Sequence, residues 1–304
     1  MKSCVTNSAA PWARMAEHGE KEALYYTKRD GGRAECALCP RHCAPRPGEA
    51  GACRARRNDG GTLYSLNYAK ISSLNLDPIE KKPLRRFMPG GMILSAGSFG
   101  CNFFCPFCQN YAISQFTPPT RTVSPEALVR AALSAKQSGN VGLAFTYNEP
   151  AVWYEYVREA AELAHARGLL NVLVTNGYIE LEPLRALLPA ISAMNIDIKG
   201  GEAFYREMCG GSREAVLRTL REAYAAGCHV EATLLLVSGR NDNMRAVTET
   251  AASIASVSDE IPLHLSRFFP RYRMEDAQPT DAGFIYSAAK AAGAILKYVY
   301  TGNI

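Results

Sequence analysis

Two hydrophobic periods alternate along the chain from Met92 onward. Six short apolar runs predict buried strands, which span residues 92–97, 142–147, 170–175, 193–198, 229–237 and 262–268. Longer stretches of helical periodicity lie between them. In one of these, Ser124 is the expected N-cap, Pro125 the first helical residue and Gly139 the stop. Six strand–helix repeats predict an α/β fold with a parallel sheet, either open and doubly wound or an incomplete barrel.

The N-terminal part of the chain follows a different pattern. Gly–Gly pairs, scattered prolines and basic residues interrupt any helical periodicity there, and only residues 62–76 alternate as strands do. The sequence therefore predicts a small, loop-rich, cysteine-containing accessory domain over residues 1–90, followed by a core domain over residues 91–304.

Composition and charge exclude several classes of function. Lys and Arg number 34 against 29 Asp and Glu, and a formal charge of +5 is too small for a protein that neutralises many phosphates. No apolar run reaches the roughly 18 residues of a membrane span, and the start lacks the apolar stretch of a secretory signal. We therefore expect a soluble, cytoplasmic protein with no nucleic-acid or membrane partner.

Each predicted strand is followed by a segment that packing alone explains poorly. In both architectures ligands bind at the carboxyl ends of the strands. The six segments at those ends are GSFGCNFFCPFCQN, TYNEP, VTNGY, DIKGG, SGRND and SRFFPRY. Six such segments along one rim predict the mouth of an enzyme.

Seven of the ten cysteines fall into two tight groups, which indicates metal binding before disulfides. The group after the first strand has C-x3-C-x2-C spacing at Cys101, Cys105 and Cys108. Structural zinc normally takes four ligands, whereas a 4Fe-4S cubane held by three thiolates keeps one iron open to another ligand. Three core cysteines or a zinc loop remain the alternatives. The scattered cysteines, Cys4, Cys209 and Cys228, are expected to be ordinary thiols.

This cysteine loop, with an aromatic Phe107 just before its third cysteine, resembles that of radical S-adenosyl-L-methionine (SAM) enzymes. The resemblance implies a partial (β/α)6 TIM-like barrel as the core domain. It also implies that SAM chelates the open iron through its amino and carboxylate groups. One electron then cleaves the sulfonium, and the resulting 5'-deoxyadenosyl radical removes a hydrogen atom from a substrate.

Other strand ends match the places where that family contacts SAM. TYNEP stands where the family has a GGE-type motif, with Tyr147 and Asn148 in place of its two glycines. The resemblance implies contacts with SAM from Phe107, Asn148, Glu149, Thr175, Asn176, Asp197 and Lys199. The alternatives are a Glu149 that caps the next helix, a simple tight turn after the third strand, and a structural ion pair between Asp197 and Lys199.

Over about 270 residues the chain resembles the AmmeMemoRadiSam-system or PflX-like branch, which is related to the pyruvate formate-lyase activating enzymes. The matching segments, in order, are CALCPRHC, GACRAR, LDPIEKKPL, GCNFFCPFCQN, TYNEP, VTNGY, MNIDIKG, HLSRFFPRYRM and KYVYTGNI. The branch implies a small-molecule or peptide substrate and an electron donor such as flavodoxin or ferredoxin. An activase that installs a glycyl radical on a partner enzyme is the alternative.

Two further groups of residues are candidates for binding. His264, Arg267 and Arg271 follow the sixth strand and would suit a carboxylate or phosphate of the substrate, or else lie in solvent. Four N-terminal cysteines with C-x2-C-x3-C-x9-C spacing could hold zinc or a second 4Fe-4S cluster; they are Cys36, Cys39, Cys43 and Cys53. A zinc-binding interaction module is the competing, non-catalytic interpretation.

Overall fold

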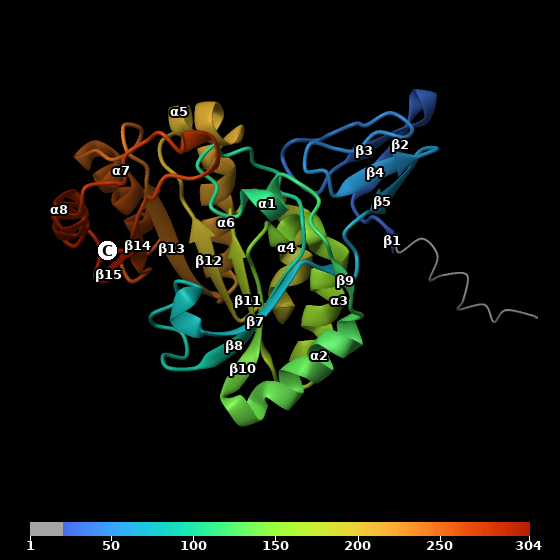
Figure 1. Ribbon diagram of the computed structural model, residues 1–304, viewed down its shortest axis with the longest axis horizontal. Coiled ribbons are helices and arrows are strands. Elements are labelled where there is room, and N and C mark those ends of the chain that lie inside the picture. The colour runs from blue at the N-terminus through green and yellow to red at the C-terminus, as the bar shows by residue number, and fades with distance from the viewer. Residues whose placement is uncertain (1–20) are drawn as a thin grey trace, which may run out of the picture.

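An eight-stranded sheet forms the centre of the molecule in the computed structural model, which describes residues 21–304 (Figure 1). Cys4 lies outside the described residues. The strands are ordered β15-β14-β13-β12-β11-β10-β8-β7. Their bounds are β7 (Ser73–Pro78), β8 (Met92–Gly97), β10 (Asn140–Phe145), β11 (Leu170–Thr175), β12 (Ala193–Asp197), β13 (His229–Leu236), β14 (Leu263–Arg267) and β15 (Val299–Gly302).

The predicted α/β architecture is confirmed as a partial barrel. In the sheet order given above, the seven strands from β15 to β8 run parallel to one another, and β7 joins the edge antiparallel to β8. All six predicted strands are present. β15 is a further parallel strand that the hydrophobic pattern did not indicate. The helices lie on the outside of the curved sheet (Figure 1). They are α2 (Pro125–Ser134), α3 (Tyr154–His165), α4 (Leu181–Leu187), α6 (Arg213–Ala225), α7 (Met244–Ala255) and α8 (Ala282–Ala292).

Local sequence accounts for the helix ends. At α2 the Ser124 hydroxyl accepts a hydrogen bond from the Ala127 amide at 3.2 Å, and Pro125 occupies the first turn. A short 3-10 turn then carries the chain to Gly139, whose φ of 82° is the left-handed conformation that ends helices. These caps determine where α2 begins and where the chain returns to the sheet at β10.

The barrel interior is closed at the end opposite the strands' carboxyl ends. The connection from β7 to β8 packs Ile79 and Leu84 against Ile93, Ala144 and Val172. Below the cavity described in the next section, the buried Glu231 carboxylate accepts hydrogen bonds from the amides of Arg85 and Arg86 at 3.1 and 2.8 Å. The core therefore fills one end of the barrel and leaves the other end for a ligand.

The N-terminal segment forms small sheets beside the barrel. Its strands are β1 (Lys21–Glu22), β2 (Tyr26–Arg29), β3 (Arg33–Cys36), β4 (Arg56–Asp59) and β5 (Thr62–Ser65), while β6 (Lys70–Ile71) pairs with β9 (Arg121–Thr122). β7 belongs to the main sheet. The main sheet therefore includes residues that the sequence analysis assigned to the accessory domain over residues 1–90. A buried ion pair between Arg56 and Glu155 of α3 ties the small sheets to the barrel.

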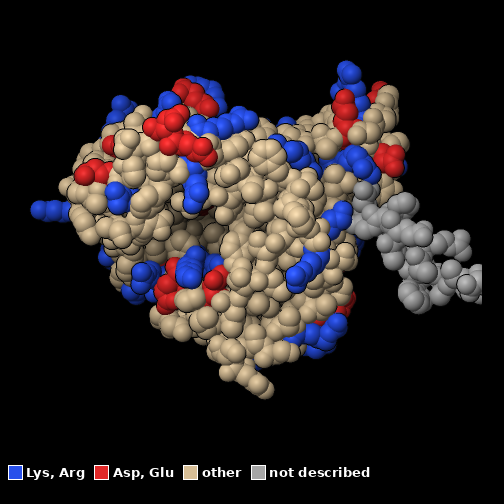
Figure 2. Space-filling model, viewed as in Figure 1, with Lys and Arg blue, Asp and Glu red and all other residues tan. Residues whose placement is uncertain are grey.

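Basic and acidic side chains are interspersed over the face shown in Figure 2, with no broad field of one sign. Within residues 21–304, none of the helices combines the length and the apolar character that crossing a membrane requires.

Candidate functional site

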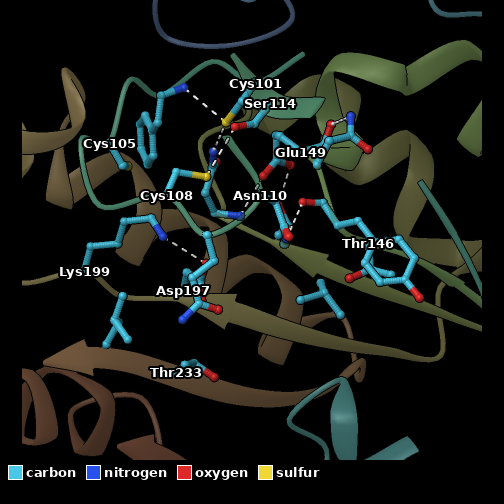
Figure 3. A pocket seen from close by; sticks show the side chains of 18 of the residues that line it. Cys101, Cys105, Cys108, Asn110, Ser114, Thr146, Glu149, Asp197, Lys199 and Thr233 are labelled. Carbon is cyan, nitrogen blue, oxygen red and sulfur yellow. Dashed lines mark hydrogen bonds and ion pairs between the residues drawn. The ribbon is translucent and has the colours of Figure 1, made fainter. Parts of the chain in front are cut away.

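A cavity of about 270 Å³ opens at the carboxyl ends of the parallel strands. Its lining takes residues from the loop after β8 and from the ends of β10, β11, β12, β13 and β14, together with Asn303 after β15. Three sulfur atoms and several amide, carboxylate and hydroxyl groups face it. The Cys101, Cys105 and Cys108 side chains lie on one side, with Asp197 and Lys199 beside them and Thr233 opposite (Figure 3).

All seven residues expected to contact SAM line this single cavity. They are Phe107, Asn148, Glu149, Thr175, Asn176, Asp197 and Lys199. They come from three strand ends and the cysteine loop, so the parallel register of the sheet is what brings them together. Their contact with SAM stays a prediction, and the hydrogen bonds below show that several of them also hold the site in shape.

The cysteine loop is held in place by the side chain of Asn148. Its Oδ1 accepts a hydrogen bond from the Ser98 amide at 2.8 Å, and its Nδ2 donates to the carbonyls of Phe99 and Gly100 at 3.1 and 3.2 Å. Gly100 has a φ of 89°, and a Cβ there would lie 2.7 Å from the carbonyl oxygen of Cys53. The loop therefore requires glycine at position 100, and the Asn148 carboxamide holds the backbone on either side of Phe99.

Polar groups approach the sulfur atoms from several directions. The Phe103 amide and the Asn176 side chain donate to the Cys101 sulfur at 3.4 and 3.6 Å, and the Ser114 hydroxyl lies 3.2 Å from the Cys108 sulfur. Burial raises the pKa of the Cys101 thiol, so a cation that binds the thiolate must displace a proton. Three convergent sulfurs with polar hydrogens around them fit an iron–sulfur cluster that takes three protein ligands.

Glu149 has the capping role that was the alternative to contact with SAM, and its contact with SAM stays a prediction. Its carboxylate caps the 3-10 helix Pro150–Trp153 by accepting from the Ala151 amide at 2.9 Å, and it also accepts from the Thr175 hydroxyl at 2.6 Å and the Asn176 amide at 2.7 Å. Burial raises the pKa of this carboxyl to about 7. It also lines the cavity, where a ligand ammonium group would favour its ionised form.

Asp197 and Lys199 form the ion pair that was the alternative to ligand contact. Lys199 Nζ lies 2.9 Å from Asp197 Oδ2, and the Tyr205 hydroxyl accepts from the Lys199 amide at 3.0 Å. Both charged groups also face the cavity. The pair offers one cation and one anion at a fixed spacing, a pattern that suits a ligand with both charges.

Tyr147, at the first glycine position of the usual motif, adopts a strained backbone. Its φ is 71°, a value that L-residues other than glycine, asparagine and aspartate rarely take. Its hydroxyl donates to Asp77 Oδ2 at 2.7 Å, and Lys82 Nζ binds the same oxygen at 2.8 Å. These bonds hold the side chain and compensate the backbone strain, so a bulky residue occupies a place where the motif has glycine.

Cys209 is a neighbour of the cysteine loop that the sequence analysis treated as ordinary. It is buried, and its thiol contacts Cys105, a contact that raises the pKa of the Cys105 thiol. Its carbonyl accepts from the Phe104 amide at 3.0 Å. It ends the π-helix Tyr205–Cys209, which follows α5 (Glu202–Phe204). No local spacing links Cys209 to the loop, so nothing in the pattern could have indicated the contact.

The three residues expected to bind substrate do not lie together. His264 sits two positions before Ser266 on the same face of β14, which places it beneath the cavity, with its Nε2 2.6 Å from Glu231 Oε2. Arg267 Nε donates to the Thr280 carbonyl at 2.7 Å. Neither of these two lines the cavity. Strand register turns His264 inward and a loop carbonyl holds Arg267, so the structure does not bring these two together at the strand end, and their contact with substrate stays a prediction.

Arg271 does lie at a second, more open cavity of about 520 Å³. This cavity is lined by Gln109, Tyr111, Phe269, Arg271, Asn303 and Ile304. Gln109 and Asn303 also line the first cavity, so the two adjoin. Arg271 therefore lies in the cavity that adjoins the one lined by the three cysteines.

The comparisons with known proteins agree with this geometry. A family model for the radical SAM superfamily matches residues 97–253. An uncharacterized protein of Methanocaldococcus jannaschii is 43% identical over 292 residues, which cover 93% of this chain and 85% of that protein.

Among solved structures, a radical SAM methyltransferase from Sphaerobacter thermophilus superposes with a TM-score of 0.56 at 15% identity, over 71% of this chain and 67% of that one. Streptococcus suis SuiB bound to S-adenosylmethionine gives a TM-score of 0.55 at 10% identity, over 66% of this chain and 48% of that one. At these identities, both show a shared fold.

Proposed function

Because this chain belongs to the radical SAM superfamily, we propose that it is an enzyme that holds a 4Fe-4S cluster at Cys101, Cys105 and Cys108 and binds SAM in the adjoining cavity. The observation that carries the proposal is that three thiols of the cysteine loop line one cavity together with seven polar or aromatic residues from that loop and three strand ends. When bound, the cluster and SAM would supply one-electron cleavage of the sulfonium, giving methionine and a 5'-deoxyadenosyl radical that removes hydrogen from substrate.

The donor set in the cavity fits this pair of cofactors. Three sulfur ligands satisfy three irons and leave one for an exogenous ligand. The Glu149 carboxylate offers an acceptor for an ammonium group, and Lys199 offers a donor for a carboxylate. Asn176 bonds both the Cys101 sulfur and the Asn102 side chain, at 3.6 and 2.8 Å, so it links the cysteine loop to the end of β11.

The remaining residues shape the site and control access. Phe107 is buried and packs against Phe204, with ring centroids 5.6 Å apart, which closes one wall to water. We propose that substrate enters through the 520 Å³ cavity, where Arg271 would bind an anionic group such as a carboxylate. The substrate class is a small molecule or peptide, and a flavodoxin- or ferredoxin-type protein is the proposed electron donor.

Product analysis tests this proposal. The protein is reconstituted anaerobically with iron and sulfide, reduced with dithionite and given SAM, and 5'-deoxyadenosine is measured by mass spectrometry. We expect the wild type to form it and Cys105→Ala to form none. Cys228→Ala is the matched control, because Cys228 is equally buried but contacts neither cysteine group, and it should retain the product.

Two results would contradict the proposal. One is full formation of 5'-deoxyadenosine by Cys105→Ala. The other is a wild-type protein that holds zinc at these thiols and no sulfide, which would favour an interaction module. A glycyl radical detected by electron paramagnetic resonance (EPR) on an added partner enzyme would instead identify the protein as an activase.

A further inference from the structure

Four cysteines of the N-terminal sheets surround a second, small cavity that the proposed reaction does not use. Cys36, Cys39, Cys43 and Cys53 all line it, and its volume is about 20 Å³, more than one water needs. Three of the four side chains are buried, and Cys43 is partly exposed. Apart from the thiols and two arginines, the lining is Leu38, Pro45, Gly51, Leu63 and Val152, so little would hold a water there.

Local backbone bonds bring the four thiols together. The Cys36 amide donates to the Cys43 carbonyl at 2.8 Å, which closes the loop between them, and the His42 amide donates to the Cys39 carbonyl at 3.1 Å. The Ala52 amide, next to Cys53, points at the Cys43 sulfur at 3.5 Å. These bonds hold the loop that carries the thiols, and the cysteines face a cavity whose other lining residues are mostly apolar.

A buried arginine lies directly against this group. Arg56 is 2% exposed, pairs with Glu155, and donates from one nitrogen to the Cys36 sulfur at 3.7 Å. Its Nε has no hydrogen-bond partner among the described residues. A fully buried guanidinium with a spare donor beside four thiols suits a site that carries negative charge.

The four thiols are neither paired with one another nor grouped round a single point. All four cysteines are free thiols, so they are not paired as disulfides. In the described part of the chain, no three Cys, His, Asp or Glu side chains are arranged to hold a metal ion. The same holds for Cys101, Cys105 and Cys108, for which the family implies a cluster. In both groups the cysteines line a cavity.

We propose that Cys36, Cys39, Cys43 and Cys53 hold a second 4Fe-4S cluster, with one protein thiolate for each iron. Because all four irons would carry a cysteine, this cluster has no position for SAM, in contrast to the one at Cys101, Cys105 and Cys108. It would also help to order a small domain that places few large apolar side chains in the core, among them Leu38 and Leu63.

The two groups are close neighbours, so a test must separate them. The Cys53 carbonyl lies against Gly100, the residue before Cys101, and Arg41 donates to the carbonyls of Asn102 and Gly210. Damage to one group could therefore disturb the other. The measurement that separates them is the iron content that remains after Cys101, Cys105 and Cys108 have been replaced.

The experiment uses the full chain with Cys101→Ala, Cys105→Ala and Cys108→Ala combined, reconstituted anaerobically with iron and sulfide. We expect about four iron and four sulfide per chain, against about eight of each in the wild type. The EPR signal of the reduced protein should not change when SAM is added. Adding Cys43→Ser, chosen because Cys43 is partly exposed, should remove most of the remaining iron, whereas adding Cys228→Ala as the matched control should not.

Several outcomes would overturn the inference. One zinc per chain without sulfide would identify a single-ion site, and iron that survives Cys43→Ser would place the cluster elsewhere. A triple variant that folds, by circular dichroism, yet binds no iron would show that the four thiols hold nothing. The proposal in the previous subsection survives each of these results, since its own readout is 5'-deoxyadenosine formed by the wild type.

Discussion

Replacing Asn148 separates two roles that this residue could have, contact with SAM and support of the cysteine loop. Its carboxamide makes one hydrogen bond to the Ser98 amide and two to the carbonyls of Phe99 and Gly100, at 2.8 to 3.2 Å. The side chain is 7% exposed, so water does not replace these bonds readily. We therefore expect Asn148→Ala to loosen the loop that carries Cys101 before it affects any contact with SAM.

The magnitude follows from the groups left without partners. The Ser98 amide and the Gly100 carbonyl lose their partner, whereas the Phe99 carbonyl keeps the bond from Asn67 Nδ2 at 3.0 Å. A buried polar group without a partner costs about 1–3 kcal/mol. The expected loss in the free energy of unfolding is about 2–4 kcal/mol, which lowers the Tm by roughly 5–10 °C. Asn148→Asp should also fail, because it keeps the acceptor for Ser98 but turns a charged oxygen toward the carbonyls of Phe99 and Gly100.

The assay combines thermal unfolding with EPR of the reduced, reconstituted protein, in which a cluster with an open iron changes its spectrum on SAM addition. Asn171→Ala is the matched control. Asn171 is fully buried and its Nδ2 bonds the carbonyls of Ala161 and Ala190, both at 2.8 Å, on the helix side of β11. Both alanine variants should lose stability, but only Asn148→Ala should lose the SAM-responsive signal. An Asn148→Ala protein with a wild-type signal that merely needs more SAM would refute the reasoning.

Three further predictions follow from the same contacts. Burial by itself would raise the pKa of Glu231, but hydrogen bonds from two histidines and two backbone amides outweigh it and lower the pKa from 4.5 to about 2. The ionised carboxylate therefore stabilises the folded protein above pH 4.5, and this stabilisation is lost as the pH falls toward 2. The shift is worth about 3 kcal/mol, so urea titrations of the metal-free chain should show the stability advantage over Glu231→Gln shrinking across that range. Gly100→Ala should lower the Tm and the iron content, because its Cβ would lie 2.7 Å from the Cys53 carbonyl and its φ is 89°; unchanged iron content would argue against a tight loop. Cys209→Ala should keep the SAM-responsive EPR signal, because three thiols suffice, whereas loss equal to that of Cys105→Ala would make Cys209 a ligand.

The sequence was sufficient for features that depend on neighbouring residues. Strand and helix periods, the cap at Ser124 and the spacing of Cys101, Cys105 and Cys108 are all local, and each led to an element or a cavity wall that the structure contains. The rule that parallel strands present their carboxyl ends together then placed the residues after those strands at one rim. The α/β class and the rim on which the candidate site lies therefore followed from pattern, whereas the partial barrel was implied by the family resemblance.

Tertiary structure decided what depends on register between distant segments. Which hydrogen bonds Asn148 makes, and the burial of His264 against Glu231, are set by how strands and loops pair across the barrel. The contact of Cys209 with Cys105 and the neighbourhood of Cys53 and Gly100 likewise join segments far apart in the sequence. Hydrophobic periodicity selects the face on which a side chain lies, but its partner is chosen by the three-dimensional packing of other chain segments, which carries no trace in the local pattern.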